Sequence, residues 1–298
     1  MFAAPGVTGA QSVWISGIYM ERVLSTYLYA EKPLTLGLLA EIAGAGIPAI
    51  ELFCLPYHFD YRSQQKVREL GDWAGEHQLR VHALHSPMER DVLSGKRDSG
   101  MPISISDPER LRRLDAVDEV KRALEVAEQI PFRFLIQHLD SGKRMADQRR
   151  FDAAFNSLEH LAIFAKQRDV VIALENTPGD LTSPSSLRQF IADTRLNDLK
   201  MCFDTGHAHM EDGIEASFET MRERVVTAHV HDNHGEKDEH QLPFEGTIDW
   251  DAALKTLASA PNELPIVLEL KEQGAAAPTL SQIAAVFDKI EKNLVRKK

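Results

Sequence analysis

Eight short apolar runs, each of strand length, alternate along the chain with longer stretches of helical periodicity. This alternation is typical of βα units and a parallel sheet. Two helix starts, Asp107-Pro108 and Ser183-Pro184, place a polar cap before a proline at the first helical position. Eight strands with helical crossovers favour closure into a single (β/α)8 TIM barrel. The predicted strands are 23–29, 49–53, 80–84, 134–138, 170–175, 199–204, 225–231 and 265–270.

An open, doubly wound sheet is the alternative arrangement of the same elements. Its nucleotide-binding forms carry a GxGxxG or GxxxxGK[ST] turn, and neither motif follows the first strand. Nearly every strand from the third onward ends in His, Glu or Asp, which is where (β/α)8 enzymes hold their catalytic residues. We therefore predict a barrel domain over 21–298, preceded by a disordered segment at 1–20. The long irregular stretch 86–106 is a candidate lid over the barrel mouth.

Charge and cysteine content narrow the classes of partner. The 34 basic and 45 acidic residues give a formal net charge of -11, so nucleic acid is disfavoured as a partner. Cys54 and Cys202 match no zinc ribbon or CxxC motif and are expected to be reduced thiols. Neither a membrane-spanning apolar run nor a signal-peptide pattern is found. We expect a soluble cytoplasmic protein without a membrane partner, and the sequence leaves homo-oligomerisation open.

Nine histidines and carboxylates fall at, or just beyond, the predicted strand ends. Each alone is more simply explained as a capped or solvated residue, but nine at one edge of a barrel are hard to obtain by accident. Carboxylate and imidazole are the ligands that divalent zinc, manganese, cobalt or iron accept. We therefore predict a metal site built from His85, His138, Glu175, Asp204, His207, His229, Asp238, His240 and Glu269.

Local spacing strengthens this prediction. In DTGH, Asp204 closes a strand and His207 lies one turn later, so that both side chains can reach one point. In HVHD, His229 and His231 are two residues apart and share a strand face. In VLEL, Glu269 is expected to point inward while its leucine neighbours pack against the outer helices. An unpaired inward carboxylate is costly, and a cation beside it removes that cost.

Seven segments carry a resemblance to a known family, and they cover the chain from about residue 25 to its end. They are AIEL at 49–52, ALENTPG at 173–179, CFDTGHA at 202–208, HVHDN at 229–233, DEH at 238–240, FEGTIDW at 244–250 and IVLEL at 266–270. With these motifs the chain resembles the xylose isomerase-like TIM-barrel superfamily. That superfamily contains sugar phosphate isomerases and epimerases and also DNA repair enzymes of the endonuclease IV type.

Resemblance to the isomerase and epimerase branch implies one divalent metal, Zn²⁺ or Mn²⁺ before Mg²⁺ or Co²⁺, held by Glu175, Asp204, His229 and Glu269. The implied substrate is a sugar, a sugar phosphate or a sugar-derived hydroxy-carbonyl compound. The reaction would be proton transfer through an enediolate, with Glu175 and Glu269 as the bases and His207 in contact with substrate.

Resemblance to the endonuclease branch implies a trinuclear zinc site and hydrolysis of a phosphodiester, as in an AP endonuclease. Its additional ligands would be His85, His138, His207, Asp238 and His240. A third hypothesis is a barrel that binds a sugar without turnover, because fold alone does not settle function.

Three departures favour the sugar branch. The first strand, LSTYLY, lacks the glycine and histidine-rich opening of the endonucleases, and the loop at 54–60 lacks basic residues. The motif AIEL places Glu51 on the second strand, as is common in isomerases. FEGTIDW resembles the isomerases' GEGxIDW, with Phe244 in place of the first glycine. We also predict substrate contacts for Glu51, His231 and Lys271, with a second hypothesis that His231 orients His229.

Overall fold

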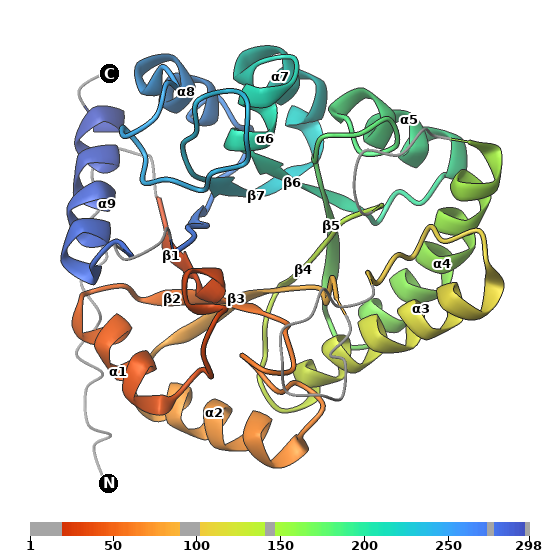
Figure 1. Ribbon diagram of the computed structural model, residues 1–298, viewed down its shortest axis with the longest axis horizontal. Coiled ribbons are helices and arrows are strands. Elements are labelled where there is room, and N and C mark those ends of the chain that lie inside the picture. The colour runs from red at the N-terminus through yellow and green to blue at the C-terminus, as the bar shows by residue number, and fades with distance from the viewer. Residues whose placement is uncertain (1–19, 90–101, 141–146, 273–276, 296–298) are drawn as a thin grey trace, which may run out of the picture.

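The computed structural model describes residues 20–89, 102–140, 147–272 and 277–295. Its eight strands pair in parallel, in the order β1 to β8, and β8 returns to β1. Helices surround the ring of strands (Figure 1). The predicted (β/α)8 barrel is therefore confirmed. The strands are β1 Arg22–Ser25, β2 Ala49–Phe53, β3 Arg80–His85, β4 Phe134–Gln137, β5 Val171–Glu175, β6 Lys200–Asp204, β7 Val225–Val230 and β8 Ile266–Leu268.

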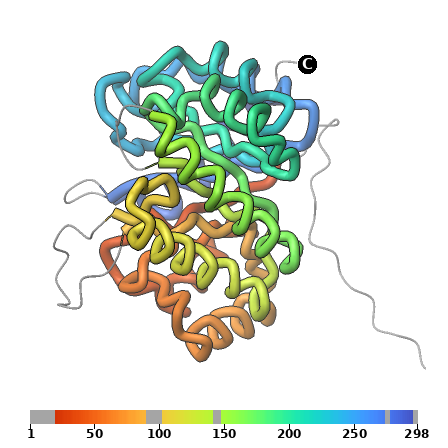
Figure 2. Tube along the Cα trace, turned by 90° about the vertical axis from the view of Figure 1, so that its right-hand side faces the viewer, coloured from red at the N-terminus to blue at the C-terminus, as the bar shows by residue number. Residues whose placement is uncertain are grey.

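The helices follow the strands in sequence and cover the outside of the barrel. In Figure 2 the N-terminal half of the chain, red to yellow, lies below the C-terminal half, green to blue. The α-helices are α1 Leu36–Gly44, α2 Gln64–Glu76, α3 Arg110–Glu125, α4 Gln148–Lys166, α5 Pro184–Thr194, α6 Thr205–Met210, α7 Ile214–Met221, α8 Trp250–Leu257 and α9 Leu280–Val295. Short 3-10 helices occupy Thr26–Tyr29, Val126–Glu128 and Arg222–Arg224.

Several predicted strand ends differ from the structure by one or two residues, and two larger differences have local reasons. The first strand ends at Ser25, because the Ser25 hydroxyl accepts a hydrogen bond from the Tyr27 amide and opens a 3-10 helix. Helix α3 begins at Arg110 and not at Pro108, because the Asp107 carboxylate accepts from the amide of Glu109, the residue just before the helix. The cap at Ser183 is confirmed, since its hydroxyl accepts from the Ser186 amide.

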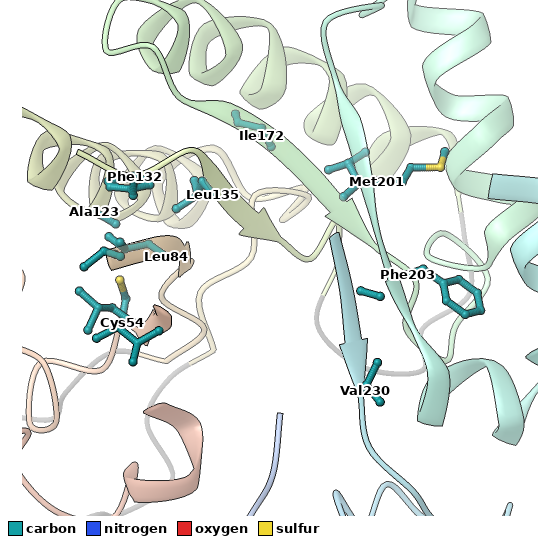
Figure 3. Close-up of a cluster of buried hydrophobic side chains, with 14 of the residues drawn as sticks. Cys54, Leu84, Ala123, Phe132, Leu135, Ile172, Met201, Phe203 and Val230 are labelled. Atoms are coloured by element: carbon teal, nitrogen blue, oxygen red, sulfur yellow. The ribbon is translucent and has the colours of Figure 1, made fainter. Parts of the chain in front are cut away.

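Alternate strand residues face the barrel interior and the helices, as the period of a strand requires. Mostly small and branched side chains, together with Phe134, fill the interior. They form one cluster of Val23, Ala49 and Val267 and another of Ala83, Phe134, Ile136, Ala173 and Cys202. The outward-facing residues join the side chains of the helices in one large apolar cluster. Figure 3 shows part of this cluster, including Leu84, Leu135, Ile172, Met201, Phe203 and Val230.

The barrel closes where β1 pairs with β8, and α9 covers this part of the ring next to α8. Arg22 on β1 makes ion pairs with Asp288 and Glu291 of α9, at 2.7 and 2.6 Å. The guanidinium also donates from Nε to the other Glu291 oxygen at 2.7 Å, so this contact is bidentate. The first strand and the last helix are thereby tied together.

Two predictions fall on residues outside the described ranges. The N-terminal segment is described only from Met20 onward, and the middle of the predicted lid, 90–101, is not described. Glu89 and Pro102, the described residues on either side of 90–101, pair in an isolated antiparallel bridge. Among the helices that the structure describes, none is long and apolar enough to cross a membrane.

Candidate functional site

Four predicted ligands converge at the carboxyl ends of consecutive strands. Glu175 ends β5, Asp204 ends β6, His229 lies on β7, and Glu269 follows β8. Asp204 and His229 are register partners on adjacent strands. One ligand atom from each of the four lies within 4.8 Å of the others, and all four side chains are buried. Parallel pairing thus places three carboxylates and one imidazole around one point.

The His229 ring directs one nitrogen at this point. Its Nδ1 lies 3.3 Å from Glu175 Oε1, 3.4 Å from Glu269 Oε2 and 4.0 Å from Asp204 Oδ2. None of these contacts has the geometry of a hydrogen bond, and Nδ1 is a buried polar atom without a hydrogen-bond partner. A buried nitrogen left this way is costly unless something pairs with it. A cation between the nitrogen and the three carboxylates meets that need.

The other five predicted ligands form two further groups beside the first. His138 Nε2 and His85 Nε2 lie 3.1 and 3.5 Å from Glu175 Oε2. His240 Nε2 and His207 Nε2 lie 2.9 and 3.3 Å from Asp238 Oδ2. In each group the ligand atoms lie within 4.8 Å of one another. The structure therefore brings all nine residues together, and Glu175 belongs to two of the three groups.

Backbone carbonyls set the orientation of three of these histidines. A carbonyl oxygen only accepts, so the ring nitrogen facing it must carry the proton, and the second nitrogen is left to face the carboxylates. This arrangement is typical of metal-ligating histidines. The bonds run from His85 Nδ1 to Ser86 O at 3.0 Å, from His207 Nδ1 to Asn176 O at 3.0 Å, and from His240 Nδ1 to Glu269 O at 2.8 Å.

The electrostatics of the group also favour a cation. Burial opposes a charge on His229, yet the surrounding Cys202, Glu269 and other acidic groups raise its pKa well above the ordinary value. Burial also opposes the charge of Glu175, but His229 and His138 hold its pKa well below the ordinary value. Burial raises the pKa of Glu269 to about 7, and the Glu175 charge acts in the same direction. These oxygen and nitrogen donors in a negative potential fit a divalent cation.

A cavity of about 140 Å³ opens above the group. Tyr27 and Phe53 form an aromatic wall, with ring centroids 4.5 Å apart, and Tyr27 also contacts the edge of His240 at 5.2 Å. Among the described residues that line the cavity there is no lysine or arginine. The wall residues Tyr27, Phe53 and Leu55 were not predicted, because an apolar strand end reads as core and Tyr27 was assigned to a strand. Met88 and Glu89, which also line the cavity, belong to the predicted lid 86–106.

The three predicted substrate-binding residues do not line this cavity. Glu51 is completely buried beneath the group, and its Oε2 lies 3.1 Å from His229 Nε2. His231 is also completely buried, and its Nε2 lies 3.1 Å from both oxygens of Asp204. Lys271 is exposed. In the structure Glu51 and His231 contact candidate ligands and not the open space, and a substrate contact for the three residues stays a prediction.

Asp232, which was not among the predicted site residues, organises the loop that carries Asp238 and His240. Its carboxylate is completely buried and accepts four N–H groups. Because a single residue collects donors from both ends of the loop, it fixes where the loop lies over the barrel mouth. The donors are the amides of Asn233, Phe244 and Ile248, at 2.9, 3.0 and 3.2 Å, and the indole Nε1 of Trp250, at 2.6 Å.

The FEGTIDW segment fits tightly around this carboxylate. A Cβ on Gly246 would lie 2.3 Å from Asp232 Oδ1, so only glycine allows this approach. Phe244, which replaces a glycine of the related motif, has a φ of 79°, in the region that glycine adopts readily. Its ring packs against Trp250 at 5.4 Å.

Comparison with known proteins gives a consistent assignment of the fold. The sequence pattern of the family described as xylose isomerase-like TIM barrel matches residues 39–290. The uncharacterized protein y4fM of Sinorhizobium fredii is 25% identical over 64% of this chain and 66% of its own length. The uncharacterized protein MJ1311 of Methanocaldococcus jannaschii is 26% identical over 83% of this chain and 82% of its own. The chain thus spans just under two thirds of the length of y4fM.

Three solved structures share the fold at low sequence identity. A D-tagatose 3-epimerase-like protein has a TM-score of 0.75 at 20% identity, covering 93% of this chain and 99% of its own. L-ribulose 3-epimerase has a TM-score of 0.76 at 14% identity, covering 93% and 96%. The IolI protein with a binding zinc atom has a TM-score of 0.69 at 15% identity, covering 93% and 99%. At these identities the likeness shows the barrel fold.

Proposed function

The chain belongs to the xylose isomerase-like TIM barrel family, and from this premise we propose that it is a metal-dependent isomerase or epimerase of a sugar or sugar-derived hydroxy-carbonyl compound. The observation that carries the proposal is the group formed by Glu175, Asp204, His229 and Glu269, of which Glu175 and Glu269 line the cavity. Relatives of the same fold include a D-tagatose 3-epimerase-like protein, an L-ribulose 3-epimerase and a zinc-binding protein, IolI.

The four residues of this group would hold the cation, in agreement with the orphaned Nδ1 of His229. When bound, a divalent ion supplies positive charge that polarises neighbouring carbonyl and hydroxyl oxygens. Glu175 and Glu269 approach from β5 and from the end of β8, and both line the cavity. One carboxylate would take the proton from the carbon next to the carbonyl. Return of a proton to the opposite face of that carbon would give the epimer, whereas its delivery to the former carbonyl carbon, with a proton moving between the two oxygens, would give the isomer.

The remaining cavity residues would bind and orient the substrate. Tyr27 and Phe53 offer an aromatic face to the C–H side of a sugar, while His207 and His240 offer ring nitrogens to its hydroxyls. The cavity walls exclude most of the solvent from the carboxylates, which lie 1 to 3% exposed. Exclusion of water allows the protein to control where the proton returns.

Solvent proton exchange tests this proposal. Incubation of ketoses and their phosphates in deuterated water is expected to place deuterium at the carbon next to the carbonyl, in a reaction that stops when a chelator is added. Glu269→Gln is expected to abolish exchange, and metal analysis of that variant separates a lost base from a lost ligand. Glu119→Gln, a buried carboxylate on α3 outside the site, is the matched control. Absence of exchange across a broad sugar screen would remove the proposal.

Hydrolysis of a phosphate ester is a second candidate function, favoured by one specific observation. Two further groups of candidate ligands lie beside the group of Glu175, Asp204, His229 and Glu269, so the site offers donors for more than one ion. One consists of His85, His138 and Glu175, and the other of His207, Asp238 and His240. Metal analysis distinguishes the candidates, since one ion per chain supports the isomerase and three zinc ions support the hydrolase. Incision of a duplex with an abasic site at low enzyme concentration would favour the hydrolase. Sugar binding with neither activity would indicate a binding protein.

A further inference from the structure

The sequence motif AIEL placed Glu51 among the substrate contacts, but its surroundings indicate a different role. We propose that Glu51 is a positioning residue, which holds the imidazole of His229 so that Nδ1 faces the metal site. This inference rests on the proposed metal site and does not depend on which reaction the site performs.

The geometry around Glu51 has two parts. Its Oε2 lies 3.1 Å from His229 Nε2, and its Oε1 accepts the hydroxyl of Ser25 at 3.0 Å. All three side chains are completely buried. Ser25 and Glu51 are register partners on β1 and β2, so the carboxylate is held from the strand beside it. The contact between Glu51 and His229 is therefore fixed inside the barrel, where little movement is possible.

A carboxylate facing an imidazole nitrogen decides which nitrogen carries the proton. An ionised carboxylate only accepts, so His229 Nε2 must donate and Nδ1 becomes the nitrogen free to bind a cation. Nδ1 is the atom that faces Glu175, Asp204 and Glu269 without a hydrogen bond. The negative charge of Glu51 also makes the ring a stronger ligand. Both effects increase metal affinity without any contact between Glu51 and the metal.

His229 differs in this respect from three of the other candidate histidine ligands. His85, His207 and His240 direct Nδ1 at backbone carbonyls, so their outer partners cannot be removed by substitution. The outer partner of His229 is a side chain and can be changed. Glu51 also follows Ala49 and precedes Phe53 on the inward face of β2; Phe53 lines the cavity, whereas Glu51 lies one layer below it. This depth separates positioning from substrate contact.

The test measures metal affinity, which does not require turnover. Zn²⁺ dissociation constants are measured by competition with a chromophoric chelator, and the visible spectrum of bound Co²⁺ reports the ligand geometry. Glu51→Gln retains an acceptor for Nε2 but loses the charge, and we expect about 10-fold weaker Zn²⁺ binding. Glu51→Met loses both, and we expect a loss of up to about 100-fold with an altered Co²⁺ spectrum.

A matched control separates positioning from structural damage. Glu119 on α3 is also a buried carboxylate, and it accepts from Tyr61 and Arg62 outside the barrel interior. Glu119→Gln is expected to lower thermal stability and leave Zn²⁺ affinity unchanged. If Glu51→Met does not fold, the isosteric Gln variant carries the comparison alone.

Two outcomes overturn the inference. Zn²⁺ affinity and a Co²⁺ spectrum equal to those of the wild type in every folded Glu51 variant would show that this side chain does not prepare the ligand. A wild-type protein that binds neither Zn²⁺ nor Co²⁺ would remove the inference together with the metal site. By contrast, weaker metal binding in the Glu51 variants of a protein that exchanges no sugar protons would support the inference and remove the proposed sugar chemistry.

Discussion

The carboxylate of Asp232 offers a quantitative test of how the loop over the barrel mouth is held. In Asp232→Asn an amide NH₂ replaces one of the two oxygens. Each oxygen accepts two N–H groups, so either orientation of the amide leaves two donors facing a donor. A hydrogen bond to a charged group contributes about 1.5–3 kcal/mol, so two lost bonds lower the free energy of unfolding by roughly 3–6 kcal/mol.

This loss is large against a typical total stability of about 5–15 kcal/mol. The assay is urea unfolding followed by far-ultraviolet circular dichroism, with the midpoint and slope compared between variants. Trp250→Phe removes one of the four donors and keeps an aromatic ring, so we expect about 1.5–3 kcal/mol for it. In the double variant the two effects should not add, because the residues share a hydrogen bond.

A decrease of less than about 1 kcal/mol in Asp232→Asn would refute the reasoning, since it would mean that water or a rearranged loop replaces these bonds. Full additivity in the double variant would show that Trp250 and Asp232 do not interact. Proteolysis gives an independent local measurement. Cleavage between residues 233 and 250 should increase in Asp232→Asn more than in Trp250→Phe, because both ends of this loop donate hydrogen bonds to the carboxylate.

Three further predictions follow from other contacts. Gly206→Ala would place a Cβ 2.0 Å from Cε1 of buried His231, so we expect a free energy of unfolding in urea that is about 1–3 kcal/mol lower, and a lower metal content. Unchanged values would contradict the close contact between Gly206 and His231. Arg22→Met removes the bidentate contact between β1 and α9, so we expect the free energy of unfolding obtained from a thermal melt to decrease by about 1–3 kcal/mol. An unchanged melting temperature would mean that apolar packing alone holds α9 against β1. Removal of the bound metal by a chelator should lower the melting temperature, because a ligand at 100 times its Kd stabilises the native state by about 2.7 kcal/mol. A melting temperature that does not change with chelator would indicate that no metal binds.

Much of the architecture could be read from the sequence because it depends on patterns of residue type. Eight apolar runs separated by helical stretches predicted the strands, and polar residues at their ends predicted which edge carries the site. The nine candidate ligands were identified because histidines and carboxylates gather at the ends of the predicted strands or in the loops that leave them. Parallel strands place their carboxyl ends at one edge, so the convergence of these residues followed from the fold class.

The individual roles depended on features that residue type does not encode. The period of a strand tells which face Glu51 occupies, but its height in the barrel depends on strand register, and register places it under His229 and not in the cavity. The backbone carbonyls that orient three histidines have no sequence signature, because every residue carries one. Tyr27 reached the cavity only because the chain turned into a 3-10 helix after Ser25. The sequence alone thus determined which chemical groups meet at the barrel mouth. The tertiary structure decided which of them face the cavity and which hold the others in place, because that division depends on distances between strands far apart in the chain.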